Sequence, residues 1–176
     1  MGYCCKEKET AKTVRLTFKR KELLYDAENC AFVEGDIMQA EDEHARHQVF
    51  DIGQGGNVDR VTRVLNLAHA ECVEMMYPYT KEDIAESEEP LDDVMAVPEE
   101  YGMILTLPEG FSQTTVNLLR EMIHEYMVCR VLADWMSITN PRSASNWEDK
   151  TMRVKIKIQT CLMARRGRMR RKLKPF

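Results

Sequence analysis

Apolar residues recur every three or four positions over three stretches of the chain, a spacing that predicts three amphipathic helices. We place these helices near residues 58–76, 113–138 and 146–165. Pro78 ends the first helix, and either Asn57 or Asp59 can cap its start. Its apolar stripe consists of Val61, Val64, Leu65, Ala68, Cys72, Val73 and Met76.

The second and third helices are separated by a very short break. Ser112 precedes the second helix as a cap, and Asn140–Pro141 ends it because the residue before a proline is steered out of the helical region. A break this short predicts an antiparallel helical hairpin. The apolar faces that we expect to meet are Val116, Leu119, Ile123, Tyr126, Met127, Cys129 and Leu132 on one helix, and Trp147, Thr151, Val154, Ile158, Cys161 and Leu162 on the other.

Two shorter segments alternate apolar and polar residues, as half-buried strands do. Residues 13–20 place Val14, Leu16 and Phe18 on one side and basic or hydroxyl side chains on the other. A second strand runs through Met103, Leu105 and Leu107 and stops at Pro108. Between residues 21 and 36 the pattern favours a helix ending near Gly35, although "CAFVEG" within it is equally compatible with a strand. The residues that support the helix are Leu23, Leu24, Ala27, Cys30 and Ala31.

The segment from Glu82 to Glu100 contains nine acids among nineteen residues, two prolines and no base. Such a composition is typical of a solvated linker or an extended arm. We therefore divide the chain into a strand-containing irregular segment plus one bundle helix (1–80), an acidic linker or arm (81–100), a short strand with the helical hairpin (101–165) and a basic tail (166–176), all within one domain. The predicted fold class is mainly α: a small helical bundle with a C-terminal antiparallel hairpin, a few short β-strands and extended terminal and linker arms.

Chain length, the lack of long apolar runs and the spacing of the cysteines limit the type of protein further. A chain of 176 residues is long enough for one domain with a real core. Nowhere do eighteen apolar residues follow one another, and the N-terminus lacks the apolar stretch of a secretory signal, so we expect no membrane partner. The six cysteines form no CxxC pair and no repeated spacing, which argues against a zinc ribbon or a disulfide framework and favours a reducing compartment.

Candidate chemistry is sparse. His44 and His47 lie three residues apart, but a zinc site needs two further ligands, and His69 and His124 are distant in the sequence. The "GQGG" stretch lacks the Lys-Ser/Thr end of a phosphate loop. We therefore predict no catalytic residue, no metal ligand and no cofactor.

Charge is distributed unevenly. The last twelve residues hold seven bases and no acid, whereas the whole chain has a formal charge of −4, so everything upstream sums to −11. A basic tail and an acidic arm can pair between copies of one protein, and such head-to-tail contacts close into rings or extend into tubes. The predicted partner-binding residues are Arg165, Arg166, Arg168, Arg170, Arg171, Lys172, Lys174 and Phe176 in the tail, and Glu82, Asp83, Glu86, Glu88, Glu89, Asp92 and Asp93 in the arm.

Nucleic acid is the alternative partner for the tail. Its cations would grip phosphates with a marked dependence on salt. The tail lacks interleaved aromatic residues that would stack on bases. We therefore rank a protein partner first, and keep a small nucleic-acid-binding or DNA-packaging accessory protein as the second interpretation.

The C-terminal half carries a resemblance. Over residues 100–176, "LTLPEGFSQTTVNLLREMIHEYMVCRVLADWMSITNP" and "RRGRMRRKLKPF" resemble small proteins encoded among the virion-structure genes of tailed phages and prophages, with weaker similarity at "FVEGDI" and "VDRVTRVLNLAHAE". A helical core with long arms is also similar to head–tail connector (neck) proteins, although those usually begin with helices and this chain begins with a strand.

The resemblance implies a structural subunit of a virion, assembled in the host cytoplasm, rather than an enzyme. Its implied partners are copies of itself in a ring, the portal, and tail or other neck proteins. Non-specific contact with DNA in the lumen of that ring is a further expectation.

Overall fold

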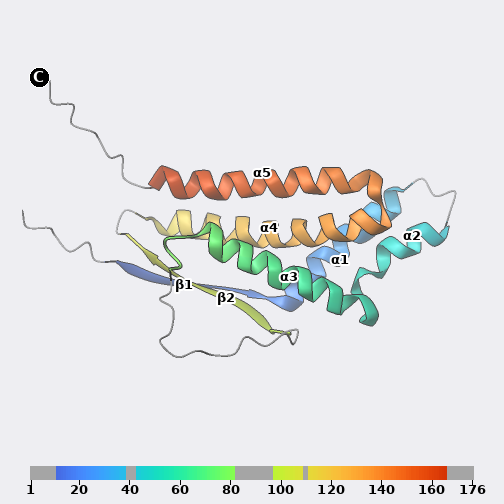
Figure 1. Cartoon of the computed structure of the whole chain (residues 1–176), viewed down its shortest axis with the longest axis horizontal. Helices are drawn as coiled ribbons and strands as arrows, with labels where there is room; N and C mark the ends of the chain where they lie inside the picture. The colour runs from blue at the N-terminus through green and yellow to red at the C-terminus, as the bar shows by residue number, and fades with distance from the viewer. Residues whose placement is uncertain (1–10, 39–42, 82–96, 109–110, 166–176) are drawn as a thin grey trace, which may run out of the picture.

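The computed structural model describes residues 11–38, 43–81, 97–108 and 111–165. Within these ranges the chain is mainly helical and carries one small sheet, as the sequence predicts (Figure 1). In chain order the elements are β1 (Lys12–Lys19), α1 (Arg20–Ile37), α2 (Glu43–Phe50), the 3₁₀ turn η1 (Asp51–Gly53), α3 (Gly55–Met75), β2 (Glu100–Leu107), α4 (Gln113–Thr139) and α5 (Pro141–Arg165).

The two strands pair antiparallel over their full length, with Lys12 opposite Leu107 and Lys19 opposite Glu100. Because side chains alternate across a strand, one face of this sheet is apolar and the other polar. The buried face consists of Leu16 and Phe18 from β1 with Tyr101, Met103, Leu105 and Leu107 from β2. A two-stranded sheet is marginal by itself, so its stability depends on the helices that cover this face.

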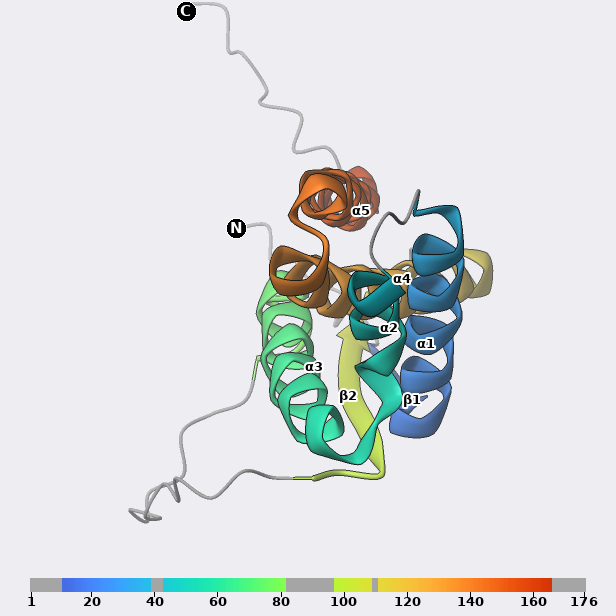
Figure 2. The same cartoon turned by 90° about the vertical axis from the view of Figure 1, so that its right-hand side faces the viewer.

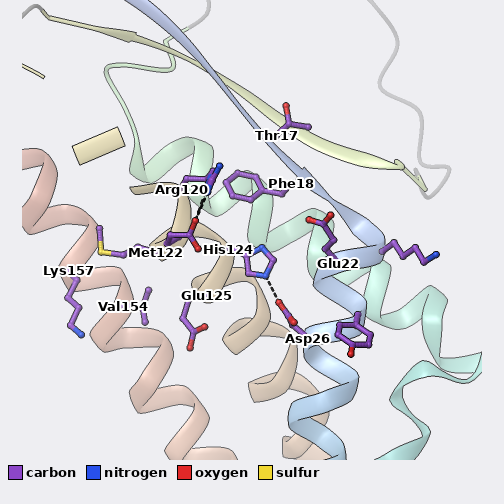
Figure 3. Close-up of a pocket in the computed structure, with 13 residues that line it drawn as sticks. Thr17, Phe18, Glu22, Asp26, Arg120, Met122, His124, Glu125, Val154 and Lys157 are labelled. Carbon is purple, nitrogen blue, oxygen red and sulfur yellow. Dashed lines mark hydrogen bonds and ion pairs between the residues drawn. The ribbon is translucent and has the colours of Figure 1, made fainter. Parts of the chain in front are cut away.

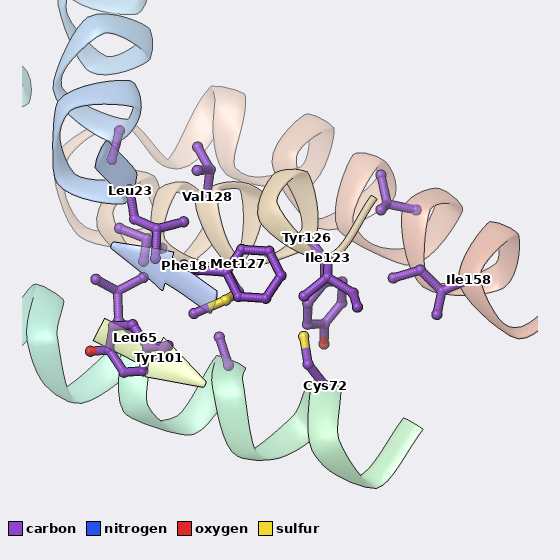
Figure 4. Close-up of a cluster of buried hydrophobic side chains, with 14 of the residues drawn as sticks. Phe18, Leu23, Leu65, Cys72, Tyr101, Ile123, Tyr126, Met127, Val128 and Ile158 are labelled. Atoms are coloured by element: carbon purple, nitrogen blue, oxygen red, sulfur yellow. The ribbon is translucent and has the colours of Figure 1, made fainter. Parts of the chain in front are cut away.

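Helix α4 is the centre of the molecule. Figure 1 shows α5 on one side of α4 and the sheet with α3 on the other, and Figure 2 shows α3 and α1 on opposite flanks. Figure 4 shows Leu65 and Cys72 of α3, Tyr101 of β2 and Ile158 of α5 around residues of α4. The α4 side chains at this junction are Ile123, Tyr126, Met127 and Val128.

Helix α1 resolves the ambiguity at "CAFVEG", because the whole segment from Arg20 to Ile37 is helical. Its buried residues are spaced four apart, as on one face of a helix: Leu23, Ala27, Ala31 and Gly35. The small residues in this row allow neighbouring elements to come close. A Cβ at Gly35 would lie 2.5 Å from the ring of Phe50 on α2.

The start of α3 differs from the prediction. The helix begins at Gly55, with Gln54 in the capping position, so neither Asn57 nor Asp59 is the cap. Asn57 lies in the first turn, and its side-chain amide donates a 2.8 Å hydrogen bond to the carbonyl of Asp51. The two glycines before Asn57 are therefore part of the helix rather than a loop. The predicted apolar stripe is confirmed, since Val61, Leu65, Ala68, Cys72 and Met76 are all buried.

The predicted hairpin is confirmed. The Ser112 hydroxyl accepts a hydrogen bond from the Thr115 amide at 3.3 Å, and α4 ends before Asn140. Helix α5 begins at Pro141, several residues earlier than predicted. Proline suits the first position of a helix because its missing N–H has no intrahelical partner there and its φ is already helical.

Candidate interaction surfaces

A groove of about 1100 Å³ is bounded by β1, α1, α4 and α5 (Figure 3). Phe18, Met122 and Val154 supply apolar lining, and charged side chains surround them. In the groove, His124 Nε2 lies 2.7 Å from Asp26 Oδ2. Because Asp26 belongs to α1 and His124 to α4, this contact joins two elements that are distant in the sequence.

A His–Asp pair can serve as a general base when a nucleophile lies within hydrogen-bond reach. The groove lining contains two hydroxyl groups, on Thr17 and Tyr25, and neither serine nor cysteine. Figure 3 shows Thr17 pointing away from His124, on the exposed face of β1. We therefore assign His124 and Asp26 to the packing of α1 on α4.

Of the cysteines in the described ranges, Cys72 and Cys129 are buried, and Cys30 and Cys161 are partly buried. Burial, aided by the Glu125 carboxylate, raises the pKa of the Cys129 thiol to about 12. Burial also raises the pKa of Cys30 and, further, that of Cys72. Nucleophilic and metal-binding cysteines act as thiolates, and these groups stay protonated near neutral pH. Cys72, Cys129 and Cys161 lie on the apolar helix faces, as predicted.

The four histidines are spread over three helices. His44 and His47 lie on α2, where His44 faces Gln48 and His47 packs edge-on against Phe50. His69 Nε2 donates to the carbonyl of Gly102 at 3.0 Å, which ties α3 to the outer edge of β2. Among the residues that the structure describes, no three His, Cys, Asp or Glu side chains gather as a metal site.

The predicted charged arms fall largely outside the described ranges. This applies to Glu82, Asp83, Glu86, Glu88, Glu89, Asp92 and Asp93, and to Arg166, Arg168, Arg170, Arg171, Lys172, Lys174 and Phe176. Arg165 is the last residue of α5. The structure does place both ends of the segment predicted as the acidic arm, and Glu100 is the first residue of β2 rather than part of an arm. The Thr106 amide on β2 donates to the carbonyl of Tyr79, and the Arg20 amide at the start of α1 donates to the carbonyl of Glu99.

The basic region begins well before the tail, inside α5. From Lys150 to the C-terminus the sequence holds eleven of the 25 cations and no acid, so residues 1–149 carry 14 cations and 29 acids, a net charge of −15. Arg153, Lys155 and Lys157 therefore belong to the same cationic region as the tail. Residues 20–53, which include α1 and α2, hold nine acids and three bases, Arg20, Lys21 and Arg46. The acidic and basic regions thus lie on different elements of the described structure.

Helix α5 also exposes a row of apolar side chains, which we call the α5 outer face: Met152, Ile156 and Met163. Their exposed fractions are 55%, 54% and 67%. The spacing of four and seven residues places them on one side of the helix. The opposite side buries Val154, Ile158 and Leu162 against α4. An amphipathic helix needs only one apolar side for its own fold, so this second row is not explained by packing within the subunit.

Helix α1 carries a comparable surface, the α1 outer face, formed by Tyr25, Asn29, Phe32, Val33 and Ile37. Tyr25 is 63% exposed and Phe32 60% exposed. Asn29 is exposed between two hollows. One hollow of about 370 Å³ is lined by Glu28, Asn29, Phe32, Phe50, Asp51, Gly53 and Gln54, and the other, of about 250 Å³, by Asn29, Cys30, Val33, Glu34 and Trp147.

These two outer faces were not predicted from the sequence. The signal for the α1 outer face was present, because Tyr25 and Phe32 lie seven residues apart and opposite the row of Leu23, Ala27 and Ala31. From the sequence alone, a helix that is apolar on two sides is expected to be deeply buried. Only the structure shows which of the two sides packs against the rest of the subunit.

Comparisons with known proteins give no further guide: no family model, no curated protein and no solved structure matches the chain. None of the described helices combines the length and apolarity needed to cross a bilayer.

Proposed function

We propose that the chain is a structural subunit that assembles with copies of itself into a ring, and that this ring is a neck component of a tailed-phage virion, between portal and tail. The observation that carries the proposal is the separation of an acidic, partly apolar surface on α1 from a basic, partly apolar surface on α5. Contiguous apolar patches on a protein surface commonly mark interaction sites.

The distribution of charge favours contacts between unlike surfaces. Two copies that met through their basic helices would bring like charges together, and so would two copies that met through their acidic sides. Contact between one acidic and one basic surface leaves a free surface of each kind at the two ends. Such head-to-tail contacts repeat until a ring closes.

The phage setting rests on the resemblance of residues 100–176 to proteins encoded among virion-structure genes. A helical core with an acidic segment between α3 and β2 and a basic segment after α5 fits a subunit held between sister copies. The resemblance also supplies the further partners, namely the portal and tail or other neck proteins. If the tail faces the lumen of the ring, its arginines contact DNA phosphates without reading sequence.

A DNA-binding accessory protein is the second candidate function, and the run of eleven cations without an acid favours it. Such a run would neutralise several phosphates and release their counterions. This candidate needs no contact between copies.

Truncation after Arg165 separates the two functions. We expect the full chain to assemble at low salt, and the chain of residues 1–165 to require about tenfold higher concentration, because the tail contributes attraction between copies. The two forms should unfold at the same temperature, since the tail follows the last packed helix. The measurements are sedimentation velocity and retention of a DNA duplex, made side by side on both forms.

The DNA-binding candidate predicts the opposite pair of results. The full chain would then be a monomer that retains DNA, and the truncated chain a monomer that does not. That outcome would overturn the structural proposal. Measuring the mass of complexes formed when the chain is mixed with portal and tail proteins encoded beside it then tests its position in the particle.

A further inference from the structure

We infer that the α1 outer face of one copy binds the α5 outer face of the next copy, helix against helix. This inference rests on the proposed function and makes it specific, because it names the two surfaces that meet. Both surfaces belong to the described residues, so the charged arms outside those ranges are not needed to define the contact.

The shapes of the two faces are complementary. Met152, Ile156 and Met163 form a ridge that spans twelve residues of α5, about 16 Å of helix. On α1 a hollow lies on each side of Asn29, and the face from Tyr25 to Ile37 spans a similar thirteen residues. Helices pack by placing the side-chain ridge of one into the groove of the other. The α5 ridge is of the right length to occupy these hollows.

The hollows are partly apolar, as the ridge requires. Phe32 and Phe50 line one of them, with ring centroids 5.2 Å apart, and Val33 and Trp147 line the other. Methionine side chains are flexible and pack well against aromatic rings. Apolar groups of α5 that are exposed in the subunit would therefore lose water against exposed Phe32 of α1 and the partly exposed rings of Phe50 and Trp147 beside it.

The charges around the contact are of opposite sign. Arg153, Lys155 and Lys157 accompany the ridge on α5, whereas Glu28 and Asp51 line the larger hollow on the α1 side. Some acids of α1 already have partners within the subunit, such as Asp36 with Arg46 at 3.3 Å. With nine acids against three bases over residues 20–53, this part of the chain still carries a net negative charge. A second α5 is excluded as the occupant because its cations would face those of the first.

One such contact is small. A stable pair of proteins commonly buries about 1,600 Å² in total, more than one helix laid on another supplies. A single contact between two copies should therefore be weak and dependent on salt, and closure of a ring should stabilise it further. The acidic arm and the basic tail would add to the same attraction.

Two single substitutions test the inference. Asn29→Lys places a cation at the centre of the α1 outer face, and Ile156→Glu places an acid in the α5 ridge. Both positions are exposed, so the subunit should fold normally. We expect each variant alone to stay a 20.5 kDa monomer at concentrations where the natural chain assembles.

The mixture of the two variants gives the sharper result. The Asn29→Lys chain keeps a working α5 face, and the Ile156→Glu chain keeps a working α1 face. An equimolar mixture should therefore form a 1:1 dimer of 41 kDa, twice the 20.5 kDa chain, and nothing larger. Sedimentation velocity and native mass spectrometry would both detect it.

Three controls accompany the test. Asn29→Asp changes the same position without adding a cation and should assemble like the natural chain. Leu67→Glu adds an acid at an apolar residue of α3 that is 51% exposed, away from both faces, and should also assemble. Thermal unfolding of every variant shows whether the fold is kept.

The outcomes separate the two proposals. If the natural chain assembles and both variants assemble equally well, the inferred contact is wrong and the proposed function stands. A mixture that stays monomeric at low salt, even at the highest concentration at which both variants remain dissolved, would overturn the head-to-tail pairing of these faces. A natural chain that is monomeric at every concentration would overturn both proposals.

Discussion

Helices α4 and α5 form the two arms of one hairpin, yet their surfaces differ. Helix α4 has 27 residues and buries side chains on all its sides, including Leu119, Ile123, Met127 and Leu132, each with no exposed surface. Helix α5 has 25 residues and buries one row against α4. Its other side presents Met152 and Ile156 to solvent.

The difference shows which part of the chain is constrained by folding and which is available for binding. Helix α4 contacts α1, α3 and α5, and 13 of its 27 residues are buried, so packing dictates about half of its positions. Helix α5 has α4 as its main partner, and the residues on its far side are not needed for the fold. We propose that the exposed apolar and basic residues there contact a partner outside the subunit.

The largest expected effect on stability comes from the centre of α4. Ile123→Ala removes a fully buried side chain where α3, α4 and the sheet meet, and should lower the free energy of unfolding by about 2–5 kcal/mol. Denaturant unfolding followed by circular dichroism measures this loss. A loss below about 1 kcal/mol would mean that α4 is less central than its burial indicates.

A smaller loss is expected at the junction of α3 and α4. The Tyr126 hydroxyl donates a hydrogen bond to the Glu71 carboxylate, and Arg130 lies 3.6 Å from the same carboxylate. Tyr126→Phe should lower the free energy of unfolding by about 1–3 kcal/mol, because a charged acceptor loses its donor. Glu71→Gln in the same assay is the matched control, since the amide oxygen can still accept this bond.

The pH dependence of stability tests the contact between α3 and β2. Burial of the His69 ring lowers its pKa below the ordinary value of 6.5, although its hydrogen bond to Gly102 opposes that shift. The unfolded chain therefore takes up this proton at a higher pH than the folded chain does. Stability from this group is complete above about pH 6.5 and is lost as the pH falls from there towards the lowered pKa.

His69→Gln provides the comparison, because the amide can still donate to the Gly102 carbonyl. The unfolding free energies of the natural chain and the variant should diverge between about pH 8 and pH 5, with the natural chain losing more. Parallel curves over that range would contradict the assignment.

The smallest effect on stability is expected on the outside of α5. Ile156→Ala trims a side chain that is 54% exposed, and should change the free energy of unfolding by no more than about 0.5 kcal/mol. The same substitution should weaken assembly, because it removes part of the ridge. A large loss of stability in the dilute monomer would show that the row is needed for folding rather than for binding.

Local patterns predicted the strands, the three long helices and the buried faces of α3, α4 and α5. The pairing of β1 with β2 was beyond such reasoning, because Lys12 and Leu107 are far apart in the sequence and no local signal joins them. The ambiguity in α1 has the same origin. Ala31 and Gly35 are helical because their small size lets α1 pack closely on its neighbours. Whether close packing is possible depends on the neighbouring elements as well as on the segment itself.

The candidate site was predicted only in part. The basic tail was predicted from the sequence. That the basic surface continues into α5 could be recognised only from the structure, which shows that Arg153, Lys155 and Lys157 flank an exposed apolar row. The acidic, partly apolar face of α1 was missed because Tyr25 and Phe32 were not recognised as lying opposite the buried row. Hydrophobic periodicity indicates an apolar side of a helix and cannot tell whether the partner belongs to the same chain.

The mass of the natural chain in solution tests the central claim most directly. Sedimentation velocity over a range of concentrations, at roughly 50 mM and roughly 500 mM salt, compares weak with strong screening of charge. Assembly through α1 and α5 predicts multiples of 20.5 kDa at low salt, ending at one fixed number of copies, and a return towards 20.5 kDa at high salt. A single 20.5 kDa species at every concentration in low salt would contradict it.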